Sequence, residues 1–140
     1  MGDHQSKPFE FHADLTGLDE ALQTLHRSIE LLRVAAGPSI DEDAVMRFET
    51  ALGEIGANVL THGRRGAGDD PIAYSLRLEG RKAHASFVDR GPAVHDQLAR
   101  AMPDAESEQG RGLAMARALL DELGYRREGD VNTWRLVKEL

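Results

Sequence analysis

The sequence predicts an α+β fold, a two-layer sandwich in which helices cover one face of a mixed, mostly antiparallel sheet. Stretches with strand-like alternation and stretches with helical spacing follow one another in the order β-α-α-β-β-α-β-β. This order lacks the regular strand–helix alternation of a doubly wound parallel sheet. The chain has 140 residues, which suits one domain, placed at residues 9–140. It has no cysteine, which excludes a disulfide framework, a thiolate metal site and a cysteine nucleophile.

The first predicted elements are a strand and a helix that follow a flexible N-terminus of residues 1–8. Phe9 and Phe11 alternate with polar residues, which is the pattern of a half-buried strand. Leucine and isoleucine then recur at three- and four-residue steps over residues 18–34, and this spacing gives one apolar helix face. Thr16 stands where its side chain would cap this helix.

A second helix and a β-hairpin are expected in the middle of the chain. Ser39 and Glu42 form the Ser-x-x-Glu pattern of a capping box. Apolar residues at helical spacing extend this helix to about His62. Alternation then predicts two strands, over residues 72–79 and 83–89, joined by a turn that contains glycine.

The last part of the chain is predicted to return to the sheet through another helix. Residues 93–102 are expected to form a short helix, and residues 103–110 an acidic, irregular loop. Apolar spacing predicts a helix over residues 113–123. Residues 125–127 and 133–137 flank a glycine turn and are predicted to form a closing hairpin.

Charge and hydropathy exclude several classes of function. The chain carries 17 basic and 24 acidic residues, a formal net charge of −7, which argues against broad nucleic-acid binding because phosphates require a basic face. No apolar run approaches the ~20 residues of a membrane-spanning helix. The N-terminal residues lack the apolar segment of a secretory signal. We therefore expect a cytoplasmic protein that binds neither nucleic acid nor membrane.

Three short segments contain residues suited to phosphate chemistry. Glu54 and Asn58 lie one helical turn apart, and a carboxylate beside a carboxamide suits a magnesium–phosphate site in which the carboxylate accepts a proton. Asp89 and Gly91 follow a strand, so the carboxylate can point into a cleft. Gly110-Arg111-Gly112-Leu113 opens a predicted helix, where unpaired amides can bind phosphate oxygens. Taken singly, each segment also fits an ordinary helix stripe, turn or cap.

The order of these segments is more specific than any one of them. An acid-plus-Asn helix, a strand-end Asp-x-Gly, a Gly-x-Gly before a helix and a Thr in the last strand follow one another along residues 9–139. In this the chain resembles the GHKL ATPase superfamily, which includes gyrase, heat-shock chaperone, histidine kinase and mismatch-repair ATPases. Within that superfamily it is most similar to the small anti-sigma-factor serine kinases.

This resemblance implies a site for ATP and magnesium. Asn58 would coordinate the metal, and Glu54 would be the base that activates a serine hydroxyl of a partner protein. Asp89 would accept a hydrogen bond from the adenine amino group, with Thr133 assisting through water. The acidic stretch 103–109 would be a short ATP lid. The residues that frame the lid and the phosphates would be Gly91, Gly110, Arg111, Gly112 and Leu113.

The resemblance also implies a function and its partners. The expected activity is that of an ATP- and magnesium-dependent protein serine kinase acting on a STAS-type anti-anti-sigma protein in a partner-switching pathway. A sigma factor or another regulator would be the second partner, and homodimers are common among such proteins. One alternative is a nucleotide-controlled binding module without phosphoryl transfer, towards which the short lid and Ala93 in the last Gly position of Asp-x-Gly-x-Gly point. Another is a detached histidine-kinase catalytic domain, which Glu54 disfavours.

Overall fold

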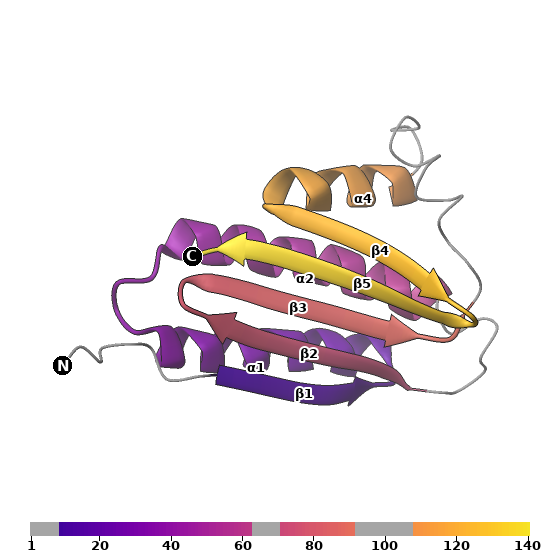
Figure 1. Ribbon diagram of the computed structural model, residues 1–140, viewed down its shortest axis with the longest axis horizontal. Helices are drawn as coiled ribbons and strands as arrows, with labels where there is room; N and C mark the ends of the chain where they lie inside the picture. The colour runs from indigo at the N-terminus through magenta and orange to yellow at the C-terminus, as the bar shows by residue number, and fades with distance from the viewer. Residues whose placement is uncertain (1–8, 63–70, 92–107) are drawn as a thin grey trace.

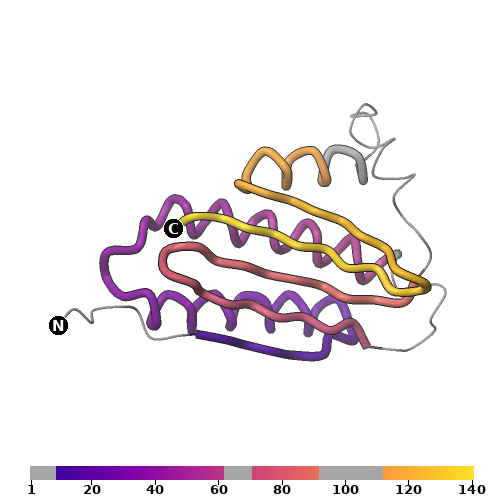
Figure 2. Tube along the Cα trace, viewed as in Figure 1, coloured from indigo at the N-terminus to yellow at the C-terminus, as the bar shows by residue number. Residues whose placement is uncertain are grey.

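The computed structural model describes residues 9–62, 71–91 and 108–140, and within them three helices cover one face of a five-stranded sheet (Figures 1 and 2). The strand order is β1-β2-β3-β5-β4, and every neighbouring pair is antiparallel. This confirms the predicted fold class. The elements are β1 (Phe9–Leu15), α1 (Leu18–Ala36), α2 (Glu42–His62), β2 (Ile72–Glu79), β3 (Lys82–Asp89), α4 (Glu108–Leu119), β4 (Glu122–Glu128) and β5 (Val131–Glu139).

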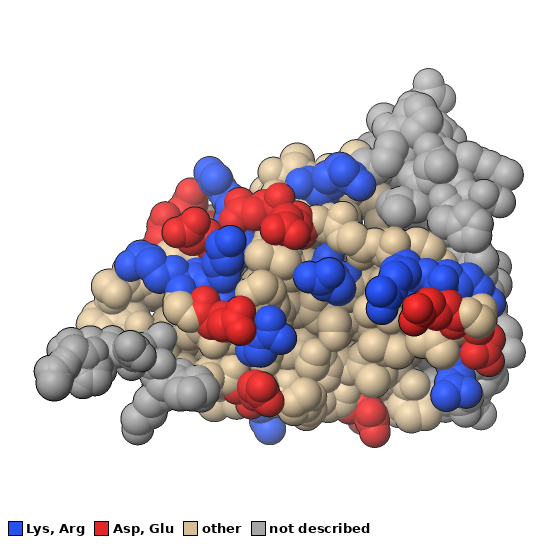
Figure 3. Space-filling view, in the orientation of Figure 1, with Lys and Arg blue, Asp and Glu red and all other residues tan. Residues whose placement is uncertain are grey.

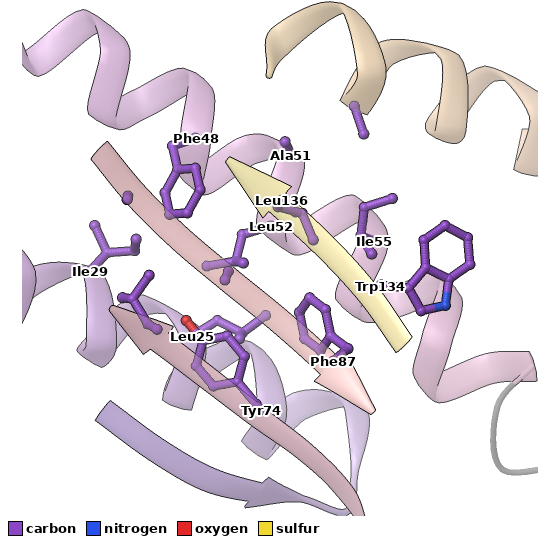
Figure 4. Packing of buried hydrophobic residues seen from close by; sticks show 14 of the residues in the cluster. Leu25, Ile29, Phe48, Ala51, Leu52, Ile55, Tyr74, Phe87, Trp134 and Leu136 are labelled. Atoms are coloured by element: carbon purple, nitrogen blue, oxygen red, sulfur yellow. The ribbon is translucent and has the colours of Figure 1, made fainter. Parts of the chain in front are cut away.

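The core lies between the helices and one face of the sheet (Figure 4). Side chains alternate across a strand, so every second residue of β2 and β3 is buried beneath the helices. Tyr74 and Phe87 lie side by side on this face with ring centroids 5.2 Å apart, and Phe48 and Ile55 of α2 are fully buried. The sheet's other face carries interspersed basic and acidic residues (Figure 3). This difference between the faces fixes the direction in which each strand residue points.

The caps of the first two helices differ from the predicted ones. Gly17, and not Thr16, is the N-cap of α1, and it makes no side-chain cap bond. At α2 the cap is Asp41, whose Oδ1 accepts hydrogen bonds from the amides of Asp43 and Ala44 at 3.0 and 3.3 Å. A carboxylate directly before a helix satisfies two amides that have no partner inside the helix. Asp41 therefore does the work that the Ser-x-x-Glu pattern assigned to Ser39.

The boundaries around α4 also correct the prediction. α4 begins at Glu108 and ends at Leu119, while β4 already begins at Glu122. The apolar residues at the predicted helix end satisfy a strand pattern equally well, and Leu123 pairs with Leu136 of β5. Strand pairing with β5 thus decides a segment that local spacing left ambiguous. The predicted short helix over residues 93–102 lies outside the described residues, as do residues 1–8 and most of the acidic loop.

Four element ends gather at one end of the molecule. In Figure 1 the end of β3, the turn between β4 and β5, the C-terminal end of α2 and the start of α4 all lie towards the right. α2 also packs directly against α4. None of the helices in the described residues is long and apolar enough to cross a membrane. The C-terminal part of α2, the end of β3 and the start of α4, which carry the candidate residues, therefore lie towards the same end of the molecule.

Candidate functional site

A buried carboxylate and a buried carboxamide face each other where β3 ends. Asp89 is the last residue of β3 and stands opposite Asn132 of β5 in the strand register. The two residues are 4% and 1% exposed. Asn132 Nδ2 donates to Asp89 Oδ1 at 2.9 Å, and the amide of Gly91 donates to the same oxygen at 2.7 Å. One oxygen of the buried carboxylate is thus held by two donors from the protein.

Two side chains of β4 complete this network. Arg127 Nη1 donates to the Gly91 carbonyl oxygen and to Asn132 Oδ1, both at 2.9 Å. The Tyr125 hydroxyl donates to Asn132 Oδ1 at 2.5 Å. The ring centroids of Tyr125 and Trp134 are 4.9 Å apart. Neither Arg127 nor Tyr125 was a sequence candidate. The signal that could have found them is their spacing, because the first and third residues of the strand predicted over residues 125–127 point to one face of the sheet.

The Asp89 carboxyl is under opposing electrostatic influences. Burial raises its pKa above the ordinary value, while the Asn132 and Gly91 donors and the Arg127 guanidinium lower it. A buried charge persists only where such partners offset the loss of water. Within the described part of the chain, Asp89 Oδ2 has no hydrogen-bond partner. The arrangement therefore offers one acceptor oxygen to a ligand group that can donate a hydrogen bond.

The side chain of Glu54 extends from α2 towards α4. It is half-buried, and a Cβ atom added at Gly112 would come within 2.8 Å of Glu54 Oε1. The carboxylate therefore lies directly against α4, in space that any side chain at position 112 would occupy. Asn58 is also half-buried and lies one turn further along the same side of α2. The structure thus brings Glu54 and Gly112 together, as the predicted site requires.

The glycine segment differs from the prediction in its place in the helix. Because α4 begins at Glu108, Gly110, Arg111, Gly112 and Leu113 lie inside the helix rather than ahead of it. Only the amides of the first turn of a helix lack an intrahelical partner, so the amides of Gly112 and Leu113 belong to the helix ladder. Leu113 is 2% exposed and packs in the core. The Arg111 side chain lies outside the described residues.

Thr133 lies on the face of the sheet opposite to Asp89. It pairs with Val88 of β3 and Arg126 of β4, whereas Asp89 and Asn132 point towards the helices. The structure therefore places Asn132, and not Thr133, beside the carboxylate. The signal was present in the sequence, because Trp134 and Leu136 are apolar at even positions of this strand and Asn132 continues their register.

The described residues offer few ligands for a metal ion. The described residues contain no group of three or more His, Cys, Asp or Glu side chains that could hold a metal ion. Asn58 offers one oxygen ligand, and magnesium commonly takes few protein ligands and keeps several waters when it is bound with a phosphate substrate. The residues present thus fit a magnesium–nucleotide complex better than a resident metal held by the protein alone.

Comparisons with known proteins agree with this fold. The model of the histidine kinase-like ATPase domain matches residues 15–138. No curated protein shows a match to the sequence. Among solved structures, the RsbU and RsbW domains of Rv1364c from Mycobacterium tuberculosis are 22% identical with a TM-score of 0.64, and the match covers 94% of this chain and 32% of that one. This chain therefore spans about a third of that protein's solved length.

Two histidine kinases are similar in fold as well. Acinetobacter baumannii histidine kinase AdeS is 16% identical with a TM-score of 0.52, over 92% of this chain and 67% of that one. The nucleotide-free catalytic domain of histidine kinase ThkA is 13% identical with a TM-score of 0.54, over 95% of each chain. At these identities the three structures show a common fold, and the matched family model covers nearly the whole chain.

Proposed function

The chain belongs to the histidine kinase-like ATPase domain family, and we propose that it is an ATP- and magnesium-dependent protein serine kinase. The observation that carries this proposal is the position of Glu54. Its carboxylate lies against Gly112 of α4, and Glu54 is one helical turn from Asn58 on α2. A half-buried carboxylate beside a magnesium ligand is suited to accept the proton of an attacking hydroxyl. A protein that only bound nucleotide would not need a base there.

The family implies ATP as the ligand, and Asp89 suits its base. The carboxylate is 4% exposed and has one oxygen, Oδ2, without a hydrogen-bond partner among the described residues. An ionised carboxylate can only accept hydrogen bonds, so this oxygen suits the 6-amino group of adenine. A bound base would give this oxygen a donor at the end of β3, where the other carboxylate oxygen is already held by Asn132 and Gly91.

Asn58 is the residue we assign to magnesium. Its side-chain oxygen is the kind of hard ligand that magnesium prefers. When bound with the nucleotide, the metal would neutralise phosphate charge and make the terminal phosphorus more electrophilic. This matters in a chain with a formal net charge of −7, because the protein's overall field repels a triphosphate.

Glu54 is the residue we assign to the transfer step. Its carboxylate would accept the proton of the partner's serine hydroxyl as the hydroxyl oxygen bonds to the terminal phosphorus. The bond from that phosphorus to the bridging oxygen breaks, ADP leaves, and phosphoserine forms on the partner. In phosphoryl transfer the protein contributes mostly by positioning and charge stabilisation, so the absence of a side chain at Gly112, which leaves room for the Glu54 carboxylate, is part of this role.

The partners of the reaction follow from the resemblance to the anti-sigma-factor kinases. We propose a STAS-domain anti-anti-sigma protein as the substrate and a sigma factor or another regulator as the second partner. Phosphorylation adds negative charge to the surface of the substrate, and this charge would change which of the two partners the chain binds. The formal net charge of −7 is compatible with protein partners and unfavourable for nucleic acid.

The proposal is tested with labelled ATP, magnesium and a panel of STAS proteins. Wild type should transfer phosphate to at least one of them, and Glu54→Gln should bind nucleotide but lose transfer. Glu49→Gln is the matched control, because Glu49 lies on the same helix and pairs with His26 of α1 at 2.7 Å. Removal of magnesium should abolish transfer, since the metal is bound with the substrate.

Three results would redirect the proposal. Nucleotide binding with no transfer to any partner would favour the nucleotide-controlled binding module. A phosphoryl group that is stable in base and lost in acid would indicate phosphohistidine, and hence a histidine-kinase catalytic domain. Equal loss of binding and transfer in Glu54→Gln would show that Glu54 is structural.

A further inference from the structure

Asn132 is the centre of a hydrogen-bond network that uses its whole side-chain amide. An asparagine amide offers two donors on nitrogen and two acceptor positions on oxygen. Asn132 Nδ2 donates to Asp89 Oδ1 at 2.9 Å and to the Gly91 carbonyl oxygen at 3.1 Å. Its Oδ1 accepts from Tyr125 and from Arg127. The amide therefore cannot rotate without breaking several bonds in a site that is nearly closed to water.

Arg127 determines which way this amide faces. An arginine side chain has donors only, so the atom of Asn132 that meets it must be the oxygen. The Tyr125 hydroxyl could serve either as donor or as acceptor, so it would tolerate both orientations. With the oxygen directed to Arg127, the nitrogen faces Asp89 and can donate to the carboxylate.

Arg127 also fixes the segment that follows β3. The same nitrogen that contacts Asn132 donates to the Gly91 carbonyl oxygen at 2.9 Å. The amide of Gly91 in turn donates to Asp89 Oδ1. Arg127 thus restrains Asp89 by two routes, through Asn132 and through Gly91. Both routes end on Oδ1, so Oδ2, which has no hydrogen-bond partner among the described residues, is held in a fixed direction.

We propose that Arg127 is a positioning residue that, through Asn132, orients Asp89 and so determines which nucleotide base the chain selects. The inference rests on the proposed function. A carboxylate oxygen held in a fixed direction as an acceptor favours a base with an amino group at the position it faces and rejects one with a carbonyl oxygen there. Burial raises the pKa of the Asp89 carboxyl, and the Arg127 guanidinium opposes this effect by lowering it.

Arg126 is the matched control for this role. It is the next residue in β4 but points to the opposite face of the sheet, where its side chain is 74% exposed and pairs with Glu128 at 3.7 Å. A substitution there changes the same charge in the same strand and leaves the network untouched. Any effect of net charge or of hairpin stability in general should therefore be common to both positions.

The test compares MgATP with the magnesium complex of inosine triphosphate, which has a carbonyl oxygen in place of the 6-amino group. Affinities for both are measured by calorimetry with wild type, Arg127→Gln, Arg127→Lys and Arg126→Gln. Wild type and Arg126→Gln should prefer ATP equally. Arg127→Gln should lose about tenfold of this preference, which corresponds to about 1.4 kcal/mol. Arg127→Lys should recover part of it, because it retains the charge without the planar donors.

The ratio of the two affinities is independent of the folded fraction, because both nucleotides are measured on one preparation and share ribose and triphosphate. An unchanged ratio in Arg127→Gln would overturn the inference and leave the proposed function in place. Equal loss of affinity for both nucleotides would show a structural role and would also overturn it. A wild type that binds neither nucleotide would overturn the proposed function and the inference together.

Discussion

Replacing Asn132 by aspartate would test the network most directly. The two side chains have nearly the same shape, but the substitution exchanges the nitrogen that donates to Asp89 and Gly91 for an oxygen. Two carboxyl groups would then meet at about the 2.9 Å that now separates Asn132 Nδ2 from Asp89 Oδ1. Like charges this close in a buried site cannot both remain ionised, so the pair should retain one proton.

The size of the effect follows from the cost of that proton. An aspartate with an ordinary pKa of ~3.9 must be protonated at the expense of about 1.36 kcal/mol for each pH unit above that value. The free energy of unfolding should therefore fall by about 4 kcal/mol at pH 7 and by about 1.5 kcal/mol at pH 5. The sign follows from linkage, because the pKa of the pair is raised in the folded state and its stability is lost as pH rises.

Urea unfolding at the two pH values measures this difference. Trp134 is the single tryptophan of the chain and is 4% exposed beside Tyr125, so its fluorescence reports unfolding at the site itself. Thr133→Asp is the control, since it adds a carboxylate to the same strand on the opposite face and should show little pH dependence. A loss of stability in Asn132→Asp that is equal at pH 5 and pH 7 would refute the reasoning.

Two further pairs of variants test the helix caps and the packing of α2. Asp41→Ala should destabilise the protein by about 1 kcal/mol, whereas Ser39→Ala should have an effect below about 0.5 kcal/mol. Thermal unfolding in which Ser39→Ala is the less stable variant would indicate that Ser39, and not Asp41, caps α2. Gly56→Ala would bring a Cβ within 2.9 Å of Leu25 Cδ1 while Gly53→Ala meets nothing within 4 Å. Gly56→Ala should therefore be less stable than Gly53→Ala by about 1–3 kcal/mol, and equal denaturant midpoints would contradict this packing.

Most of the fold could be predicted because the sequence pattern and the burial requirement agree. The strand over residues 72–79 alternates clearly, and the observed strand has the same bounds. The prediction was wrong where one local sequence pattern is compatible with two structures. Ser39 and Asp41 are both good caps, and only the actual start of α2 at Glu42 decides between them. Likewise, Leu123 fits a helix face or a strand until its pairing with Leu136 is known.

The candidate site was predictable in its residue types but not in its geometry. Glu54 and Asn58 belong to the Glu-x-x-x-Asn pattern on a helix, and Asp89 belongs to the Asp-x-Gly pattern at a strand end. The sequence does not show that Asn132 is the neighbour of Asp89, because the strand register between β3 and β5 is a tertiary property. A shift of one residue moves a side chain to the other face of the sheet, and this is the whole difference between Thr133 and Asn132.

The positioning residues are harder to find because their role depends on contacts between distant segments. Arg127 contacts Gly91 across 36 positions of sequence, and Glu54 meets Gly112 from another helix. In both cases the residues that meet come from elements far apart in the sequence. The local motifs thus provide the reactive groups, while β4 and α4 determine their orientation. Substitutions at Arg127 and Gly112 should consequently alter selectivity and transfer more than the sequence motifs alone would suggest.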